Sequence, residues 1–370
     1  MPYKTVQECS VKLLVPQARI PEEGDVFYNP VMRFDRNISI AVASLLDKIL
    51  EKSKETIRVC DLLAASGIRA LRYSKEAGLD VTANDISPKA AELMRKNAKQ
   101  NGASLEIVQK NANVLLATEN FDFIDIDPFG SPVYFADAAA GSIPFRGFLA
   151  ATATDLGPLM GAYPEVARRR YGLRSLDTDY NKELGLRILI TAMQARFFAR
   201  EKTFVPQFAY VRRHYFRIYG RVRYGNKNVN ATLKDYGYVS HCFECGWRAC
   251  TLAQTCPLCK KKTEFCGELY LGDIQNIDFC TEVSEELWKR GFSEEAAFVK
   301  SVGEEAQFPF YSNTHYVAEK LKTSSPRIES VIAKLQEEGF KATRTHFCGT
   351  AVKTNAGFDE VKKIIGKNIR

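Results

Sequence analysis

Short apolar runs alternate with amphipathic stretches along residues 57–154. The runs at 57–64, 79–84, 105–109 and 147–154 have the length and composition of buried strands, and a further run at 121–126 alternates apolar and polar positions. Residues 66–77 and 88–101 have helical spacing, and Gly102 ends the second stretch. Successive strand–helix units predict an α/β fold with a Rossmann-like, doubly wound sheet.

The same pattern divides the chain into four parts. Residues 1–56 form an N-terminal lead-in or cap with a helix over 38–50, and residues 57–235 form the sheet domain, with a helix over 179–200 and two strands within 204–224. Residues 236–268 are rich in cysteine. Residues 269–370 are expected to form a C-terminal α/β accessory domain, with helices at 282–290 and 312–322, a third helix that closes at Gly339, and a strand pair within 341–353.

The strand at 121–126 leads into Asp127-Pro128-Phe129. Ligands of open α/β sheets bind at the carboxyl ends of the strands. Asp127 and the Pro128 carbonyl accept hydrogen bonds and Phe129 offers a flat face, so the three suit the exocyclic amine of a nucleobase. An Asp-Pro turn that only closes a core strand explains the same residues. Asp125 points to the same side as Asp127, and we expect a buried structural acid paired with backbone or an arginine. The alternative is an acid that couples to Asp127 and titrates together with it.

A nucleoside cofactor is indicated by the turns that follow the strands. The turn after the first strand has one glycine, Gly67, where a dinucleotide site has G-x-G-x-x-G, which argues against a bound pyrophosphate. Asp85 follows the second strand, where an acid holds ribose hydroxyls, while Ser87 serves the alternative role of helix cap. A nucleoside without pyrophosphate indicates S-adenosylmethionine. Its site is expected to include Asp61, Asp85, Ile86, Asn111 and Ala112, the last two beside the adenine ring.

Positive charge is concentrated in one segment of the chain. Residues 151–235 contain 16 Lys and Arg and 7 Asp and Glu, a net charge of +9 against +8 for all 370 residues. Such a surface, with aromatic residues interleaved, favours a nucleic-acid partner over a membrane. Solvated charge, and a packed aromatic face in the strand pair at 204–224, are the alternatives. The expected RNA contacts are Phe27, Arg168, Arg169, Arg212 and Arg213.

Six of the ten cysteines lie between Cys242 and Cys266. Two C-x-x-C pairs with ten residues between them are typical of a zinc ribbon, in which four thiolates surround Zn²⁺ and leave no open position. A structural zinc site is therefore expected, with reduced, unliganded thiols as the alternative. Its ligands would be Cys242, Cys245, Cys256 and Cys259.

Four motifs in order, VFYNPVMRFDRN, DLLAASGIRALRY, ANDISPKA and DIDPFGSP, make the chain resemble the tRNA guanine-N2 dimethyltransferases of archaea and eukaryotes over nearly its whole length. The resemblance implies a class I S-adenosylmethionine-dependent methyltransferase acting on N2 of guanosine 26 in tRNA. It also implies that Asp127 is the catalytic acid. The cofactor contacts that it implies are Arg36, Arg69, Asp85, Asn111 and Ala112. DPFG departs from the D/N-P-P-Y/F clamp of amino methyltransferases by lacking the second proline.

Two other functions fit the same sequence. One is a methyltransferase for another RNA amine, such as guanine N2 of rRNA or adenine N6, and the other is a non-catalytic, zinc-containing RNA-binding protein. Acids at both strand ends, Asp85 and Asp127, favour an enzyme. The N-terminus lacks a secretory signal and no run approaches the ~20 apolar residues of a membrane span, so we expect a cytoplasmic protein. We also expect a monomer, with residues 269–370 docking RNA.

Overall fold

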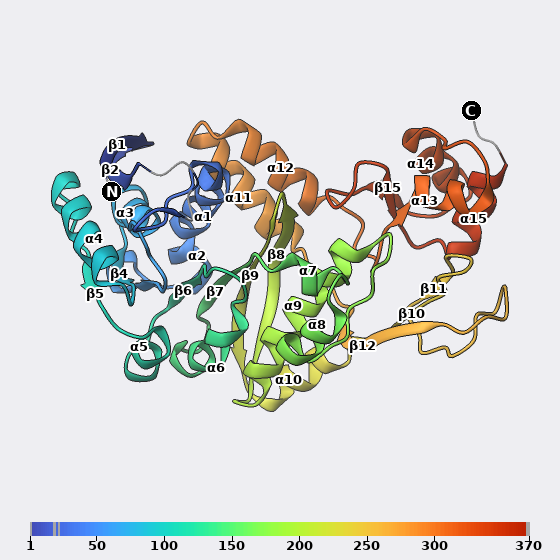
Figure 1. Cartoon of the computed structure of the whole chain (residues 1–370), viewed down its shortest axis with the longest axis horizontal. Helices are drawn as coiled ribbons and strands as arrows, with labels where there is room; N and C mark the ends of the chain where they lie inside the picture. The colour runs from blue at the N-terminus through green and yellow to red at the C-terminus, as the bar shows by residue number, and fades with distance from the viewer. Residues whose placement is uncertain (1, 18–19, 21–22, 368–370) are drawn as a thin grey trace.

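The centre of the molecule is a seven-stranded, mostly parallel sheet, seen in a computed structural model that describes residues 2–17, 20 and 23–367 (Figure 1). Its strand order is β5-β4-β3-β6-β7-β9-β8, and β9 runs antiparallel to both of its neighbours. The predicted doubly wound sheet is confirmed, and the second strand pair extends it. The strands are β3 (Arg58–Asp61), β4 (Asp80–Asn84), β5 (Glu106–Val108), β6 (Phe123–Ile126), β7 (Phe148–Ala153), β8 (Lys202–Arg212) and β9 (Tyr215–Tyr224).

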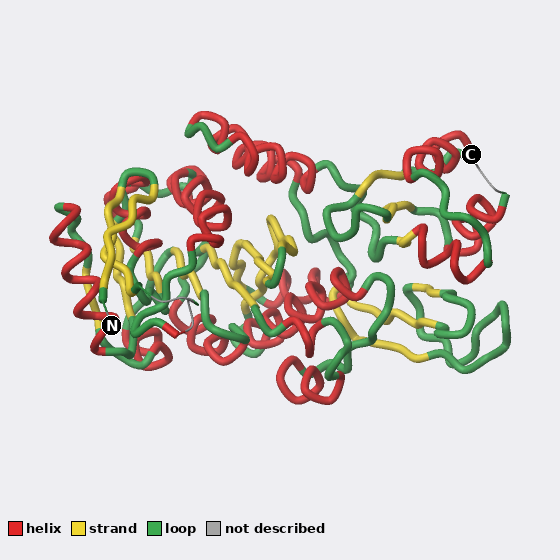
Figure 2. Tube along the Cα trace, turned by 45° about the horizontal axis from the view of Figure 1, so that its top comes forward, coloured by secondary structure: helices red, strands yellow, loops and turns green. Residues whose placement is uncertain are grey.

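Helices cover both faces of this sheet (Figure 2). One face packs on α5 (Ala112–Thr118), α6 (Val133–Ser142) and α9 (Asn181–Phe198), and the other on α1 (Arg33–Ser44), α3 (Ile68–Ala77), α4 (Pro88–Asn101), α11 (Ile277–Lys289) and α12 (Ser293–Gly303). The expected boundary at residue 269 does not separate two cores, because Val283 and Val299 are buried with the sheet. In the described parts of the chain, no helix is both long and apolar enough to cross a membrane.

The N-terminal part packs directly on the sheet domain. A hairpin of β1 (Tyr3–Glu8) and β2 (Val11–Pro16) buries Val11, Leu13 and Val15 against α3 and α4. The chain then passes through short helices and α1, whose apolar side faces the sheet. The short helices are η2 (Pro30–Met32), α2 (Leu46–Leu50) and η3 (Lys54–Thr56).

Two smaller sheets lie at the opposite end of the molecule from this hairpin (Figure 1). The first, which we call the ribbon, consists of β10 (Tyr236–His241), β11 (Arg248–Ala249) and β12 (Glu264–Tyr270). The second consists of β13 (Ser312–Asn313), β14 (Ala342–Arg344) and β15 (Ala351–Thr354), with α13 (Thr314–Leu321), α14 (Ile328–Glu337) and α15 (Phe358–Gly366) around it. Trp247 of the ribbon packs on the core of this second unit, so the two are joined.

The outer edge of β8 is covered by side chains from the C-terminal part. The Gln275 amide accepts from the Ala209 N–H at 3.1 Å and donates to the Ala209 carbonyl at 2.6 Å, as a neighbouring strand would. The Val211 N–H donates to His346 at 3.3 Å. His346 is held in turn by Glu305, 2.6 Å from its Nδ1. The backbone of β8 is thus satisfied at Ala209 and Val211 without a further strand.

The aromatic side chains of the strand pair are core residues. Phe208, Tyr210 and Tyr219 are fully buried, and Arg217 beside them is buried too. Phe208, Tyr210 and Tyr219 therefore do not belong to the surface expected to contact nucleic acid, and the alternative of a packed aromatic face is confirmed. The reason is that β8 and β9 lie between two helical layers.

Three shorter helices complete the domain. Helices α7 (Leu156–Leu159) and α8 (Pro164–Tyr171) pack on α9, and α10 (Asn226–Leu233) packs on β8 and β9.

Candidate active site

A cavity of about 730 Å³ opens at the carboxyl ends of β3, β4 and β6. It brings together residues from positions 27 to 215, and nine of the residues predicted from the sequence line it. The nine are Phe27, Arg36, Asp61, Arg69, Asp85, Asp127, Pro128, Phe129 and Arg213. The cavity therefore lies where an α/β sheet binds its ligand.

Asp127 and Pro128 present two open hydrogen-bond acceptors to this cavity. Asp127 is 24% exposed, and its Oδ2 is 2.5 Å from Nη2 of Arg69. Among the described residues, no donor reaches Oδ1 of Asp127 or the Pro128 carbonyl. The loop is fixed by Gly130, whose N–H donates to Oγ1 of Thr154 at 2.7 Å and whose φ of 86° suits glycine. Both acceptors are thus held ready for an N–H donor.

Two phenylalanines stand at the mouth of the cavity. Phe129 is 69% exposed, and Phe27 contacts it edge to face with ring centroids 4.7 Å apart. At this exposure most of the Phe129 ring is not covered by other parts of the protein. The face of Phe129 is therefore suited to stack on a flat ring.

A buried network of charges supports Asp127 from below. Arg217 donates to both oxygens of Asp125 at 2.8 Å, and Arg69 contacts Asp35, Asp125 and Asp127. Burial alone would raise the pKa of Asp125, but the guanidinium groups of Arg217 and Arg69 lower it to about 2. The expectation that Asp125 is a structural acid paired with arginine is confirmed.

Arg69 lines the cavity and is also paired with three carboxylates. It is buried, and burial disfavours its charged form, but Asp125, Asp127 and Asp35 together raise its pKa well above the ordinary value. The DLLAASGIRALRY motif indicates Arg69, but only the structure reveals its ion pair with Asp127. Ser39 and Arg217, which complete the network, carry no local sequence signal.

Arg36 reaches the cavity from α1 but is tied to the N-terminal hairpin. Its Nε and Nη2 donate to the two carboxylate oxygens of Glu8 at 2.7 and 2.6 Å. Arg72 donates to the same carboxylate at 3.0 Å. Glu8 lies in a strand that the sequence pattern did not predict, so this contact was missed.

The acids at the ends of β3 and β4 have different surroundings. Asp85 accepts backbone N–H groups from Ser87 at 2.9 Å and Ala65 at 3.0 Å, and each of its oxygens keeps a lone pair for a ligand. Asp61 accepts the Ala70 N–H at 3.1 Å. Burial raises the pKa of Asp61 to about 7, and the charge of Asp125 adds to the effect. Asp85 thus offers hydrogen-bond acceptors to a ligand, while Asp61 is a buried group that keeps its proton up to a higher pH than usual.

Three predicted cofactor residues lie outside the lining of the cavity. Ile86 is 64% exposed, and Ala112 is buried in α5. Asn111 caps α5 by accepting the Asn113 N–H at 2.9 Å. They follow β4 and β5 and so share the edge of the sheet at which the cavity opens.

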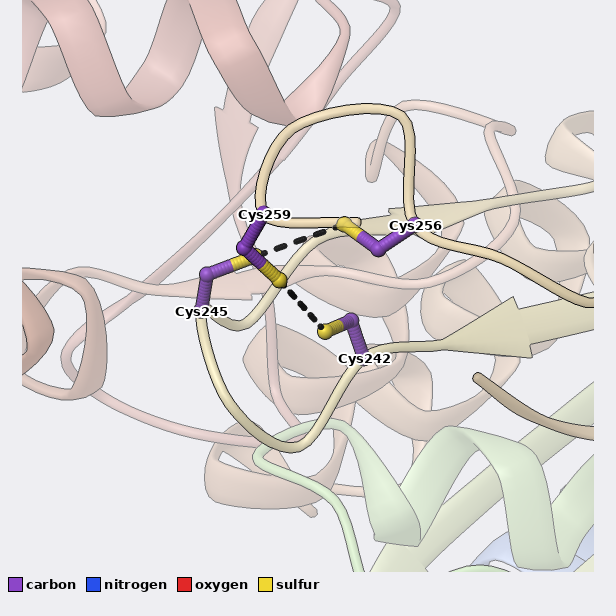
Figure 3. Close-up of side chains that lie close together, drawn as sticks. All are labelled: Cys242, Cys245, Cys256 and Cys259. Atoms are coloured by element: carbon purple, nitrogen blue, oxygen red, sulfur yellow. Dashed lines mark hydrogen bonds between the residues drawn. The ribbon is translucent and has the colours of Figure 1, made fainter. Parts of the chain in front are cut away.

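The four cysteines of the two C-x-x-C pairs converge at the end of the ribbon (Figure 3). The sulfurs of Cys242 and Cys259 are 3.4 Å apart, those of Cys245 and Cys256 are 3.6 Å apart, and all four lie within 4.8 Å of one another. Sulfurs around zinc are separated by about 3.8 Å, given Zn–S bonds of ~2.3 Å in a tetrahedron. The donor set and its spacing therefore fit a closed tetrahedral site.

The four arginines among the predicted RNA contacts occupy three places. Arg213 is exposed at the β8–β9 turn on the rim of the cavity. Arg212 is 26% exposed, packs over Phe34 and pairs with Glu294. Arg168 and Arg169 are exposed on α8, and Arg168 lines a groove of about 880 Å³ between α8 and the ribbon, which we call the ribbon groove. The other side chains of this groove include Arg174, Phe243, Lys262 and Phe265.

Residues 6–366 match the model of a family described as N2,N2-dimethylguanosine tRNA methyltransferase. A tRNA (guanine(26)-N(2))-dimethyltransferase from Methanosarcina barkeri is 38% identical over 99% of both chains. A tRNA (guanine(26)-N(2)/guanine(27)-N(2))-dimethyltransferase from Aquifex aeolicus is 34% identical over 97% of this chain and 94% of its own. The structure of Trm1 from Pyrococcus horikoshii with S-adenosyl-L-methionine has a TM-score of 0.85 and 31% identity, covering 98% of this chain and 99% of that one. The chain therefore belongs to the N2,N2-dimethylguanosine tRNA methyltransferase family.

Proposed function

We propose that this protein transfers methyl groups from S-adenosylmethionine to N2 of guanosine 26 in tRNA, giving N2-methylguanosine and then N2,N2-dimethylguanosine. The observation that carries the proposal is the pair of open acceptors, Asp127 Oδ1 and the Pro128 carbonyl, beside the exposed ring of Phe129. An exocyclic amine has two N–H donors on a flat ring and so matches this set.

The cofactor is assigned to the half of the cavity formed by β3 and β4. Asp85 keeps lone pairs toward the ribose hydroxyls, and Arg36 and Asp61 border the remaining space. Ile86, Asn111 and Ala112 contribute the edge on which the adenine ring would rest. When bound, S-adenosylmethionine supplies an electrophilic methyl group, which N2 takes with its lone pair while the S–C bonding electrons stay on sulfur.

The residues of the DPFG loop act on the amine. The N2 lone pair of guanine is delocalised into the ring, and hydrogen bonds from N2–H to Asp127 and Pro128 localise it on nitrogen. Asp127 then takes the proton that N2 releases. Holding the amine in line with the methyl group supplies a large part of the acceleration. Phe129 stacks on the base, and Phe27 moves aside or fills the gap left by the flipped nucleotide.

Zinc is assigned to Cys242, Cys245, Cys256 and Cys259, in a structural role, since four protein thiolates leave no position for a substrate. The tRNA backbone is assigned to Arg168, Arg169, Arg212 and Arg213, with the C-terminal part assisting. We further propose that the protein works as a monomer in the cytoplasm.

The test is incubation of the protein with methyl-labelled S-adenosylmethionine and an unmodified tRNA transcript, followed by digestion and mass spectrometry. Mono- and dimethylguanosine are expected, and a transcript with adenosine at position 26 should give neither. Methylated adenine, or label in rRNA alone, would overturn the substrate but keep the chemistry. Binding of tRNA without product would leave the non-catalytic function.

A further inference from the structure

In the dimethylation of one amine, the number of N2 hydrogens available to the two acceptors differs between the first and the second transfer. In the first transfer N2 has two hydrogens, and Asp127 and the Pro128 carbonyl can each accept one. In the second transfer N2 has one hydrogen and one methyl group. One acceptor must then hold the remaining hydrogen alone while the other yields its place to the methyl group.

Asp127 is held far more firmly than an exposed loop residue. Both N–H bonds of Nη2 in Arg69 are occupied, one by Asp127 Oδ2 at 2.5 Å and one by Asp35 Oδ2 at 3.0 Å. Nη1 of Arg69 donates to Oγ of Ser39 at 2.6 Å. The guanidinium is planar, so these three bonds fix its orientation and that of the carboxylate it holds.

Asp35 and Ser39, which hold Arg69, are themselves held by further hydrogen bonds. Tyr210 donates to Asp35 at 2.6 Å, and Ser39 lies 2.9 Å from the hydroxyl of Tyr219. Nη2 of Arg217 donates to the same Ser39 oxygen at 3.2 Å. Four elements, α1, α3, β8 and β9, therefore meet at Arg69. The Pro128 carbonyl has no comparable support among the described residues.

We propose that Arg69 is a positioning residue that keeps Asp127 as the acceptor in both transfers and so sets the product number at two. This inference rests on the proposed function. In the second transfer the N2 lone pair forms the new N–C bond, the S–C electrons remain on sulfur, and the last N2 hydrogen leaves as a proton to Asp127. The methyl group from the first transfer then lies toward Pro128.

The experiment compares two substrates, unmodified tRNA and tRNA that already carries N2-methylguanosine at position 26. Arg69→Lys keeps the positive charge but loses the fork that reaches Ser39, Asp35 and Asp127 together. We expect it to slow the second transfer at least about tenfold more than the first, since Asp127 is then the sole acceptor. Monomethylguanosine should accumulate.

The matched control is Arg72→Lys. Arg72 lies one turn along the same helix, is buried, and pairs with Glu8 and Glu76 without touching Asp127. It should leave the ratio of the two rates at the wild-type value even if the unfolding temperature falls. Ser39→Ala is the milder second variant, because it removes one anchor of Arg69 and no charge, and it should shift the ratio in the same direction.

The two rates are compared at saturating S-adenosylmethionine, because Arg69 is also an expected cofactor contact, and calorimetry of each variant sets the saturating concentration. A second transfer that is slowed more than the first in Arg69→Lys and Ser39→Ala supports the inference. Equal slowing of both transfers in the two variants overturns it, because a lost cofactor contact alone would slow both transfers alike. Absence of any N2-methylated product from the wild-type protein would instead overturn the proposed function.

Discussion

Asp61 is a buried carboxyl group whose neighbours include Asp125, Asp127 and Arg69. Its folded pKa of about 7 lies above the ordinary value of 3.8, which the unfolded chain has. Between these two values the unfolded state releases a proton that the folded state keeps. Stability contributed by this group is therefore present at low pH and is lost as pH rises toward 7.

Asp61→Asn removes this titration but keeps an oxygen that accepts the Ala70 N–H. Relative to wild type, the variant should gain on the order of 2 kcal/mol in unfolding free energy between pH 5 and pH 8. Urea unfolding of both proteins at the two pH values measures the difference. An equal difference at both values would mean that Asp61 is already ionised at pH 5.

Asp127→Asn tests the acceptor itself. The amide keeps one acceptor oxygen but takes no proton and loses the ion pair with Arg69, so we expect the rate of methyl transfer to fall by about 10²- to 10⁴-fold. Affinity for S-adenosylmethionine should stay within about threefold of wild type. A large loss of cofactor affinity would mean that Asp127 belongs to the other half of the cavity.

Asp127 and Arg217 differ in whether their place in the site can be predicted from the sequence. Asp127 was predicted because it follows a strand, and the ends of strands gather at one edge of a sheet. Arg217 and Ser39 are 178 positions apart, and their contact depends on where β9 enters the sheet. No local pattern encodes that placement, so the sequence does not predict the charge network that holds Arg69 and Asp127.

Among whole elements, helix α4 could be predicted from the sequence and hairpin β1–β2 could not. The helix was predicted at residues 88–101, as found, because Ser87, Pro88 and Gly102 define both of its ends. The hairpin was missed, since its turn places Cys9 at a φ of 49° and has neither glycine nor asparagine. Its strands are six residues each, too short for a clear period.

Strand β9 allows a sharp test of packing. A Cβ atom at Gly220 would lie 2.5 Å from the ring of Phe204 and 2.7 Å from the Val205 carbonyl. Gly220→Ala should therefore lower the unfolding free energy by about 1–3 kcal/mol, measured by urea denaturation. Gly349→Ala, where nothing lies within 4 Å, is the control and should change it by less than about 0.5 kcal/mol.

The ribbon should depend on its metal. Cys245→Ser removes one of four ligands, and the zinc content, measured by mass spectrometry of the purified protein, should fall from about one ion per chain toward zero. Cys250→Ser, at an exposed cysteine outside the cluster, should leave it unchanged. Wild-type protein without zinc would favour unliganded thiols.

At the scale of the molecule, a basic surface crosses the ribbon groove. Lys260, Lys261 and Lys262 are exposed on the ribbon, and Lys262 lines the groove together with Arg168. Replacing the three lysines by alanine should weaken tRNA binding and flatten its dependence on salt, by roughly one unit of slope for each phosphate that the protein no longer neutralises. Binding assays at several salt concentrations measure both quantities.

The control for these lysines removes the same charge elsewhere. Arg95, Lys96 and Lys99 are exposed on α4, at the other end of the molecule from the ribbon (Figure 1). Their replacement by alanine should leave the salt slope nearly unchanged. Equal effects of the two triple variants would mean that net charge matters and the groove does not.

The division of the chain was harder to predict than its elements. The apolar faces of α11 and α12 indicate that they bury one side, but not against which surface. The structure packs them on the sheet beside α1, over 230 residues earlier in the chain. Residues on both sides of position 269 belong to one hydrophobic core, so the change in composition near that position does not separate two domains.

The cover over β8 has a consequence for any shortened form of the protein. An open edge strand offers unpaired N–H and C=O groups to other chains, and copies then stick together edge to edge. Gln275 and His346 block that route at Ala209 and Val211, and neither is among the residues that line the cavity. A fragment ending near residue 270 would keep the DPFG loop but lack both of these side chains, so we expect it to associate edge to edge where the whole chain does not.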